Sequence, residues 1–377
     1  MHMAVRTTEE EARITRRRFL AVAGVATGMA GAGAAERPLA AQKADLATRF
    51  EEASRLMRAQ TDSGEVAAAV LHVRRAGQEL SRAFGAAHAD MPFLLASPTK
   101  PMTASAVLWL RDRRELALTD AVTKFVPDFR GGERGAVTIH HLLTHTSGLP
   151  DMLPENTELR RQHAPLSEFV ARTCRTPLLF RPGEKVSYQS MGILLGAAIV
   201  EKVSGEPMPG FVARTVFNPL GMRRTSFGLG GRRVTDTAQC QVPEAERSDW
   251  DWNSLYWRNL ASPWGGAHAT ARDLGTFLEA FASTGGDVLP KTTTREMRAI
   301  QTGTLRPRFG LGWQREPGAF GRTCSAETFG HSGSTGTLIW HDPATATTCV
   351  VLTTRPATGS RSSLLIPVSE IIGRTGG

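Results

Sequence analysis

A serine and a lysine three positions apart, Ser97 and Lys100, could supply a nucleophile and its base. Residues i and i+3 share one face of a helix, so a helix that begins near Ser97 would bring the hydroxyl and the amine together. A lysine shielded from water loses part of its proton affinity and can act as a base near neutral pH. The pair is typical of a serine activated by an adjacent base. The same spacing also fits a capped helix start with an exposed lysine.

A tyrosine in the segment 182–190 is a candidate partner for this pair. Tyr188 is one of only two tyrosines in the chain, and an apolar helix is expected from Met191 onward. A phenol at a loop-to-helix junction can relay a proton if nearby cations lower its pKa. The alternative is a tyrosine that simply packs at a helix start.

A third candidate element is the glycine-rich segment 330–336, which leads into an expected strand. It holds His331 followed by small residues, and such residues at a sheet edge can line a cleft. The backbone N–H of Ser334 could then pair with that of Ser97 to form an oxyanion hole. A plain glycine-rich hairpin is the alternative.

The order of these patterns resembles the active-site set of the serine β-lactamase and penicillin-binding-protein superfamily, which reads S-x-x-K, Y-x-(N/S) and (K/H)-(S/T)-G. The surrounding sequence is also similar to this family, over residues 93–118, 142–150, 182–195 and 265–278. The resemblance covers residues 45–370. It is closest to the branch that holds class C β-lactamases, family VIII esterases and D-aminopeptidases.

This resemblance implies a role for each residue. Ser97 would form an acyl-enzyme, Lys100 would accept its proton, and Tyr188 would share that task and protonate the leaving group. The backbone N–H groups of Ser97 and Ser334 would hold the oxyanion. The expected substrate-binding residues are Ser190, His331, Ser332, Gly333 and Trp264.

Two departures from the family pattern bear on the substrate. Class C β-lactamases usually have Asn where this chain has Ser190, and Lys where it has His331. Both changes lower the expectation of a β-lactamase and raise that of an esterase or of a peptidase or amidase.

The elements that would position these residues follow from hydrophobic spacing. We expect an antiparallel sheet built from N- and C-terminal strands and flanked by helices, with an all-helical lobe inserted at approximately 100–270. The class is α+β, an α/β sandwich, and the family resemblance makes it β-lactamase/transpeptidase-like. The expected strands are 66–73, 78–84, 309–315, 335–341 and 346–354, and the expected helices are 44–60, one beginning near Ser97, 138–144, 166–174, 190–203, 208–216, 271–283 and 362–373.

Residues 1–41 are typical of an export signal and lie outside the expected catalytic domain, 42–377. Arg16-Arg17-Arg18-Phe19-Leu20 precedes a short, weakly apolar stretch and then small residues. This pattern resembles a twin-arginine signal peptide, and the stretch is short for a membrane span. The expectation is a periplasmic or secreted bacterial protein without stable membrane insertion after signal removal.

Composition narrows the remaining function classes. The 377 residues are 41% hydrophobic and 21% charged, as in globular proteins. The net charge of +9 includes +2 from residues 1–41, and the basic residues are scattered without a nucleic-acid-binding motif, so no nucleic-acid partner is expected. Four cysteines lie far apart in sequence and leave disulfide pairing open. No metal or organic cofactor is expected.

Three other features carry alternatives. His140, His141 and His145 invite a metal site, although HExxH is absent. Ser332 lies in GHSGS, which narrowly misses the nucleophile elbow of α/β-hydrolases. Trp250, Trp252, Trp257 and Trp264 crowd into fifteen residues and either wall the acyl side of the cleft or pack a long loop.

The sequence therefore predicts an exported serine hydrolase that acts through a Ser97 acyl-enzyme on a small-molecule ester, amide or peptide. Esterase activity is favoured over a true β-lactamase. The alternatives are a D-amino-acid peptidase or β-lactamase-type amide hydrolase, an acyltransferase, and a non-hydrolytic binding or sensor homologue. Neither the physiological substrate nor the oligomeric state follows from the sequence.

Overall fold

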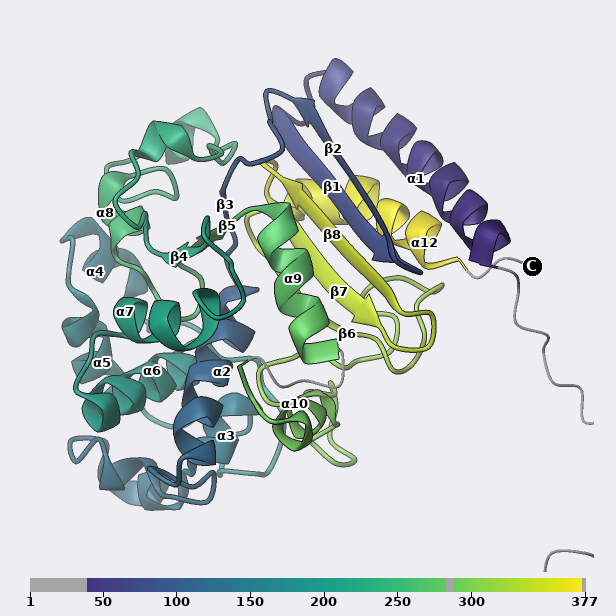
Figure 1. Ribbon diagram of the computed structural model, residues 1–377. Helices are drawn as coiled ribbons and strands as arrows, with labels where there is room; N and C mark the ends of the chain where they lie inside the picture. Colours follow the sequence, from purple (N-terminus) through teal and green to yellow (C-terminus); the bar gives the residue numbers. More distant parts are fainter. Residues whose placement is uncertain (1–38, 283–287, 375–377) are drawn as a thin grey trace, which may run out of the picture. The chain divides into compact units, whose positions relative to one another are not determined.

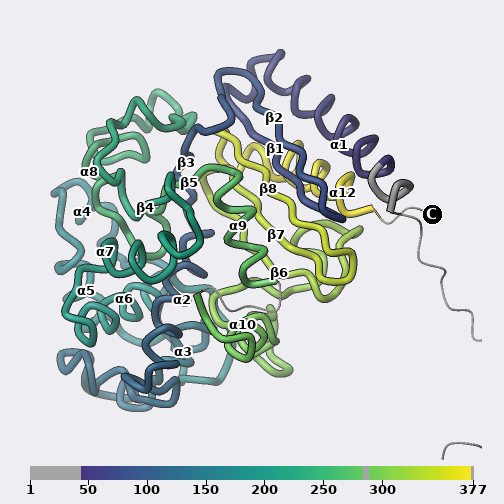
Figure 2. Tube along the Cα trace, viewed as in Figure 1, coloured from purple at the N-terminus to yellow at the C-terminus, as the bar shows by residue number. Residues whose placement is uncertain are grey.

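The computed structural model describes residues 39–282 and 288–374, and its largest sheet joins the two ends of that region. The sheet has five antiparallel strands in the order β2-β1-β8-β7-β6. Figure 2 shows β1 and β8 side by side although nearly 280 residues separate them in sequence, and Val70 faces Leu352 in their register. The strands are β1 (Ala68–Arg75), β2 (Gln78–Gly85), β6 (Phe329–Gly333), β7 (Thr337–Asp342) and β8 (Thr347–Thr353).

Helices cover both faces of this sheet because its central strands are apolar on both sides. Side chains of Leu71 and Val73 pack under α1 (Leu39–Asp62) and α12 (Ile366–Gly373). Val70 points to the opposite face, which α9 (Ala271–Ala282) covers. The two-residue period of a strand explains this division, and it confirms the antiparallel α+β class.

The helices between β2 and α9 form a separate layer beside the sheet (Figure 1). At its centre α2 packs on α6, whose residues are apolar nearly all round. The α-helices of this layer are α2 (Thr99–Asp112), α3 (Ile139–Leu143), α4 (Asn156–Arg161), α5 (Leu166–Arg175), α6 (Met191–Ser204), α7 (Met208–Val212) and α8 (Leu255–Asn259). A small sheet of three strands has the order β3-β5-β4. Its strands are β3 (Phe93–Leu94), which lies between β2 and α2 in the chain, β4 (Ser226–Phe227) and β5 (Ala267–Ala269), which directly precedes α9.

Some sequence-based boundaries were wrong. The expected strand at 309–315 forms only isolated bridges, Phe309 to Gln314 and Gln314 to Gly330. Gly312 explains this, because its φ of +80° breaks the extended path and a Cβ there would lie 2.7 Å from the side chain of Ala104. Several elements were not predicted as such, namely the helices α4, α8 and α10 (Lys291–Arg298) and the strands β3, β4, β5 and β6. The expected helix at 362–373 consists of a π-helical turn (Arg361–Leu365) followed by α12, and a separate short helix, α11 (Ala357–Ser360), precedes it.

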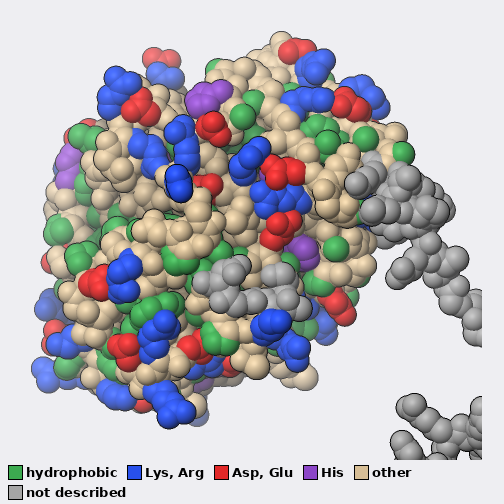
Figure 3. Space-filling model, viewed as in Figure 1, with side chains coloured by type: hydrophobic (Ala, Val, Ile, Leu, Met, Phe, Trp, Pro, Cys, Tyr) green, Lys and Arg blue, Asp and Glu red, His purple; other side chains and the backbone are tan. Residues whose placement is uncertain are grey.

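The expected leader lies almost entirely outside the described residues, and its last three residues, 39–41, belong to α1. None of the described helices combines the length and apolar character needed to cross a membrane. All four cysteines are free thiols, so the described chain holds no disulfide. On the face shown in Figure 3, basic and acidic side chains are interspersed.

Candidate active site

A cavity of about 630 Å³ brings together most of the residues singled out in the sequence. Its wall combines the segment before α2, the start of α6 and the turn after β6. Residues from the long loop before β5 complete it. The predicted site residues among its lining are Ser97, Tyr188, Ser190, Trp264, Ser332, Gly333 and Ser334.

Ser97 and Lys100 meet at the start of α2. Ser97 lies two residues before the first helical residue, Thr99, and its carbonyl accepts a hydrogen bond from the Lys100 N–H. The Lys100 ammonium donates to Ser97 Oγ at 3.0 Å and to the carbonyl of Trp264 at 3.0 Å. Lys100 is only 1% exposed, and this burial lowers its pKa to about 7. Close to neutral pH the amine therefore exists partly in the form that can accept the serine proton.

Tyr188 lies over the same lysine, with its ring centroid 4.7 Å from Lys100 Nζ. The condition considered for proton relay, a pKa lowered by nearby cations, is not met. Burial raises the pKa of the phenol well above its usual range, against the opposing effect of a hydrogen bond with Ser97. Because Lys100 itself loses its charge readily, it offers little electrostatic help to a phenolate. Tyr188 thus stays protonated near neutral pH and is suited to donate a proton.

The turn after β6 is fixed against the segment that carries Ser97. Thr335 Oγ1 donates to the carbonyl of Leu94 and Thr337 Oγ1 to that of Leu95, each at 2.7 Å. A Cβ on Gly333 would lie 2.2 Å from the Leu95 carbonyl oxygen, so only glycine permits this approach. These contacts place Ser334 on the cavity wall that also carries Ser97. The role of their two N–H groups as an oxyanion hole stays a prediction.

Sequence reasoning missed Asp151, which follows directly after the block at 142–150. The Ser190 hydroxyl donates to its Oδ1 at 2.6 Å, and the Ser190 N–H donates to its carbonyl at 3.2 Å. Its carboxylate lines the catalytic cavity and favours the charged form of Lys100, which opposes the effect of burial. The site thus has a carboxylate bonded to Ser190, where a class C enzyme would present an amide.

Comparison with known proteins decides the family. A family model described as Beta-lactamase matches residues 53–367. The chain belongs to the Beta-lactamase family. It is 32% identical over 324 residues to the esterase EstB of Burkholderia gladioli, covering 75% of this chain and 82% of EstB.

Solved structures of the family show the same fold. EstCE1, a hydrolase with promiscuous acyltransferase activity, matches with a TM-score of 0.73 at 22% identity, over 88% of this chain and 100% of EstCE1. An octameric penicillin-binding protein homologue from Pyrococcus abyssi matches with a TM-score of 0.71 at 21% identity, over 86% and 78% of the two chains. These findings confirm the predicted superfamily. The protein is a serine hydrolase of this family that takes small-molecule ester or amide substrates.

His331 departs from the Beta-lactamase family pattern in residue type. It is fully buried and lies behind the cavity wall rather than in its lining, with its ring centroid 6.0 Å from that of Tyr188. Its Nδ1 lies 2.9 Å from the carbonyl of Ser332, and burial lowers its pKa to about 3. A neutral imidazole therefore stands where many members carry a charged lysine, and the substrate-binding role of His331 stays a prediction.

The tryptophan-rich loop contributes to the cavity. Trp252, Trp257 and Trp264 line it, whereas Trp250 lines an adjoining cavity. Trp264 is only 3% exposed, so little of its ring is open to the cavity. Its carbonyl also accepts a hydrogen bond from Lys100. The loop therefore packs on the helices and walls the cavity at the same time, and acyl-group contact stays a prediction.

The three histidines considered as metal ligands do not converge. The His145 ring packs against that of Tyr188, with their centroids 4.7 Å apart and their planes tilted by 39°, and it accepts a hydrogen bond from the Gln189 N–H. Its pKa lies well below the usual value because it is buried. Within the described residues, no three histidine, cysteine or acidic side chains gather in a way that could hold a metal ion.

Proposed function

We propose that the protein is an esterase-like hydrolase that acts through an acyl-enzyme on Ser97. The observation that carries this proposal is the buried Lys100 amine, which lies 3.0 Å from Ser97 Oγ and has a pKa lowered to about 7. A neutral amine at hydrogen-bonding distance is what a serine needs in order to lose its proton as it attacks.

The reaction follows from the arrangement. Lys100 takes the hydroxyl proton while Ser97 Oγ attacks the carbonyl carbon, and the N–H groups of Ser97 and Ser334 stabilise the oxyanion. Tyr188 gives its proton to the departing alkoxide, and transfer of the proton from Lys100 to the phenolate resets both groups. Attack of water on the acyl-enzyme then releases the acid and restores Ser97.

The contact between Ser190 and Asp151 supports an ester over a β-lactam substrate. A class C enzyme uses an Asn at the position of Ser190 to hold the substrate amide, whereas here the hydroxyl proton is directed to Asp151. An ester lacks the amide N–H and does not need that partner. The similarity to the esterase EstB supports the same preference.

The test compares wild type with Ser97→Ala on a short-chain p-nitrophenyl ester and on a chromogenic cephalosporin. We expect ester turnover that vanishes in the variant and little cephalosporin cleavage. Equal ester turnover in both proteins would remove Ser97 from the mechanism. Rapid cephalosporin cleavage would identify a β-lactamase. Stable acylation of Ser97 without turnover, seen by mass spectrometry, would indicate a sensor or a transferase.

We further propose export through the twin-arginine route, on the basis of Arg16 and Arg17 followed by Phe19 and Leu20. Replacing both Arg16 and Arg17 by Lys keeps the charge and should retain the protein in the cytoplasm, whereas wild type appears in the periplasmic or secreted fraction. If the wild type and the double variant reach the periplasm in equal amounts, the arginine pair is not needed for export.

A further inference from the structure

The catalytic cavity adjoins a second, larger one of about 1040 Å³, which we call the 241–252 cavity after the loop that lines it. Arg160 and Trp252 belong to the walls of both. Arg355, Pro356, Thr358 and Gly359 also line the 241–252 cavity, while Ala357 and Arg361 of the same stretch line the catalytic one. The two cavities therefore share a boundary on two sides.

Arg160 is held at this boundary by aromatic rings. Its guanidinium carbon lies 3.9 Å from the ring centroid of Trp257 and 5.2 Å from that of Trp250. Its Nη2 donates to the carbonyl of Trp250 at 2.9 Å. Within the described residues Arg160 forms no ion pair, and its buried Nε has no hydrogen-bond partner. Within the described residues Nη1 also forms no hydrogen bond, and a half-buried guanidinium that is positioned by stacking with such a donor is suited to bind an anion.

The nearby carboxylates have other partners. Glu65 forms an ion pair with Arg355 across the same cavity. Asp251 Oδ2 accepts the Ser248 N–H at 2.9 Å and Oδ1 accepts the Asn253 N–H at 2.6 Å. Glu246 and Arg247 are exposed and bring opposite charges to the rim. Arg160 thus lies at the boundary without an ion pair to any described carboxylate, although the charge of Asp251 favours its protonated form.

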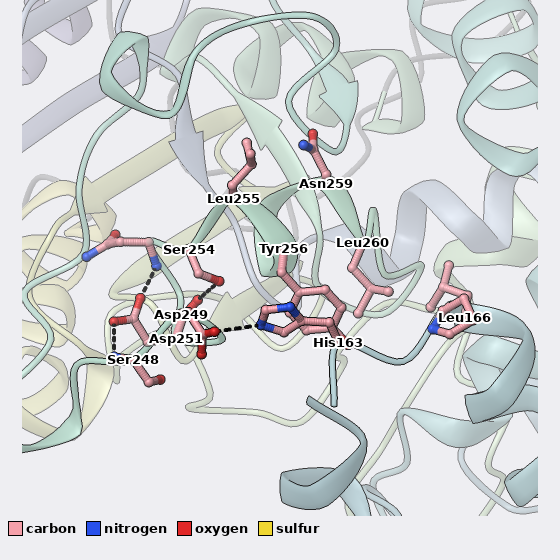
Figure 4. Close-up of a pocket in the computed structure, with 12 residues that line it drawn as sticks. His163, Leu166, Ser248, Asp249, Asp251, Ser254, Leu255, Tyr256, Asn259 and Leu260 are labelled. Atoms are coloured by element: carbon pink, nitrogen blue, oxygen red, sulfur yellow. Dashed lines mark hydrogen bonds and ion pairs between the residues drawn. The ribbon is translucent and has the colours of Figure 1, made fainter. Parts of the chain in front are cut away.

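The loop that carries Trp250 and Trp252 is fixed from both sides. Figure 4 shows its other surface, where His163 lies over Tyr256 and faces Asp249, with Nε2 3.3 Å from Oδ2. The fully buried Arg258 donates from Nε to the carbonyl of Trp252 at 2.9 Å. The ring positions around Arg160 are therefore set by the fold before a ligand arrives, which lowers the entropic cost of binding.

We propose that the two cavities form one extended site, and that Arg160 binds a carboxylate carried by the substrate at a distance from the scissile bond. The substrate class is thus an ester with a remote acidic group rather than a simple neutral ester. This proposal rests on the proposed ester hydrolysis at Ser97 and adds the substrate class to it.

The test uses matched substrates. One set consists of mono-p-nitrophenyl esters of dicarboxylic acids of increasing chain length, each paired with the methyl-capped neutral diester. The second set places the carboxylate on the alcohol side, as acetate esters of ω-hydroxy acids, again paired with neutral methyl esters and followed by acid release. The readout is the ratio of kcat/KM for the acidic member to that for its neutral partner.

We expect this ratio in wild type to exceed one at an intermediate length in one of the two sets. Arg160→Met should lower it by about tenfold or more, since a charge-assisted contact with a half-buried guanidinium is lost. The matched control is Arg161→Met, which removes the same charge from the next residue of α4. Arg161 is exposed and pairs with Glu158, so the ratio should stay at its wild-type value.

Two results would overturn the proposal. One is a wild-type ratio at or below one at every length in both sets. The other is an equal fall in Arg160→Met and Arg161→Met, which would show a general charge effect. Thermal unfolding of each variant shows whether it folds. If Arg160→Met has a folding defect, Arg160→Lys, which keeps the positive charge, is compared with wild type instead. If wild type hydrolyses neither the acidic nor the neutral esters, the proposed ester hydrolysis at Ser97 fails, and this result is distinguishable from failure of the subsite alone.

Discussion

Two fully buried cations, Lys100 and Arg258, show how the same burial has opposite chemical outcomes. Lys100 is 1% exposed and Arg258 0% exposed, and neither forms an ion pair within the described residues. Burial lowers the pKa of Lys100 to about 7, so the amine can give up its charge and act as a base. Burial also lowers the pKa of Arg258, but a guanidinium keeps its proton in proteins.

Arg258 keeps its charge because oxygen atoms surround it. It donates to the carbonyls of Trp252 and Ala238, to the side-chain oxygen of Asn253 and to Thr237 Oγ1. These partners belong to the loop that walls both cavities. A buried lysine thus supplies reactivity, whereas a buried arginine supplies position.

Replacing Lys100 by Arg tests the first half of this comparison and should have the largest effect. Arginine keeps the positive charge but cannot accept the serine proton, so kcat/KM for a p-nitrophenyl ester should fall by about 10²- to 10⁴-fold. The control is Lys202→Arg, an exposed position on α6 that should retain full activity. Substantial turnover by Lys100→Arg would show that another group accepts the proton.

Replacing Arg258 by Met tests the second half. The change leaves several buried oxygens without a donor, and each costs about 1–3 kcal/mol, so we expect the free energy of unfolding to fall by about 3 kcal/mol or more. Chemical denaturation measures this loss. Arg233→Met is the control, since Arg233 is exposed and forms an ion pair with Asp236 on the surface. A stability equal to wild type would contradict a positioning role.

The pH dependence sharpens the comparison with a smaller effect. The base must be neutral, so kcat/KM should rise with pH and level off above an inflection near 7. The carboxylate of Asp151 raises the pKa of Lys100. Asp151→Asn should therefore move the inflection to lower pH while Oδ1 still accepts the Ser190 hydroxyl proton. If the inflection stays in place or moves to higher pH, the group that titrates in the pH profile is not Lys100.

The buried histidines give a related prediction for stability. Burial lowers the pKa of His268 and of His331 to about 3, while both titrate near 6.5 in the unfolded chain. The unfolded state thus binds more protons between these values, and the free energy of unfolding should fall as the pH drops from 6.5 toward 3. Replacing His268 by Gln should flatten this dependence. An unchanged slope would assign the acid sensitivity to other groups.

The sequence predicted the local elements better than their long-range contacts. Apolar runs identified β1 and β8, and three ordered motifs identified the family and the residues around Ser97. Residue spacing could not reveal that Ser190 donates a hydrogen bond to Asp151 or that Arg160 packs against two tryptophans. These contacts join segments far apart in sequence, whereas hydrophobic periodicity predicts only local structure. The segment 309–315 reads as a strand by composition, yet the close approach of Gly312 to α2 prevents one.

The sequence could not settle the pKa of Tyr188 for a similar reason. A nearby lysine in the sequence suggests a cation, but its charge depends on exposure, and only the folded structure gives that. The same holds for His331, whose position behind the wall follows from packing rather than from its motif.

The glycine at position 333 has a consequence for altering the substrate range. Since a Cβ there would lie 2.2 Å from the Leu95 oxygen, the turn after β6 cannot be rebuilt without moving the segment that carries Ser97. Substitutions in the turn after β6 therefore alter the position of Ser97 as well as the shape of the substrate cavity. The loop from Gln241 to Trp252 has no such contact with Ser97, so libraries directed at that loop can change which molecules enter while leaving the reacting groups in register.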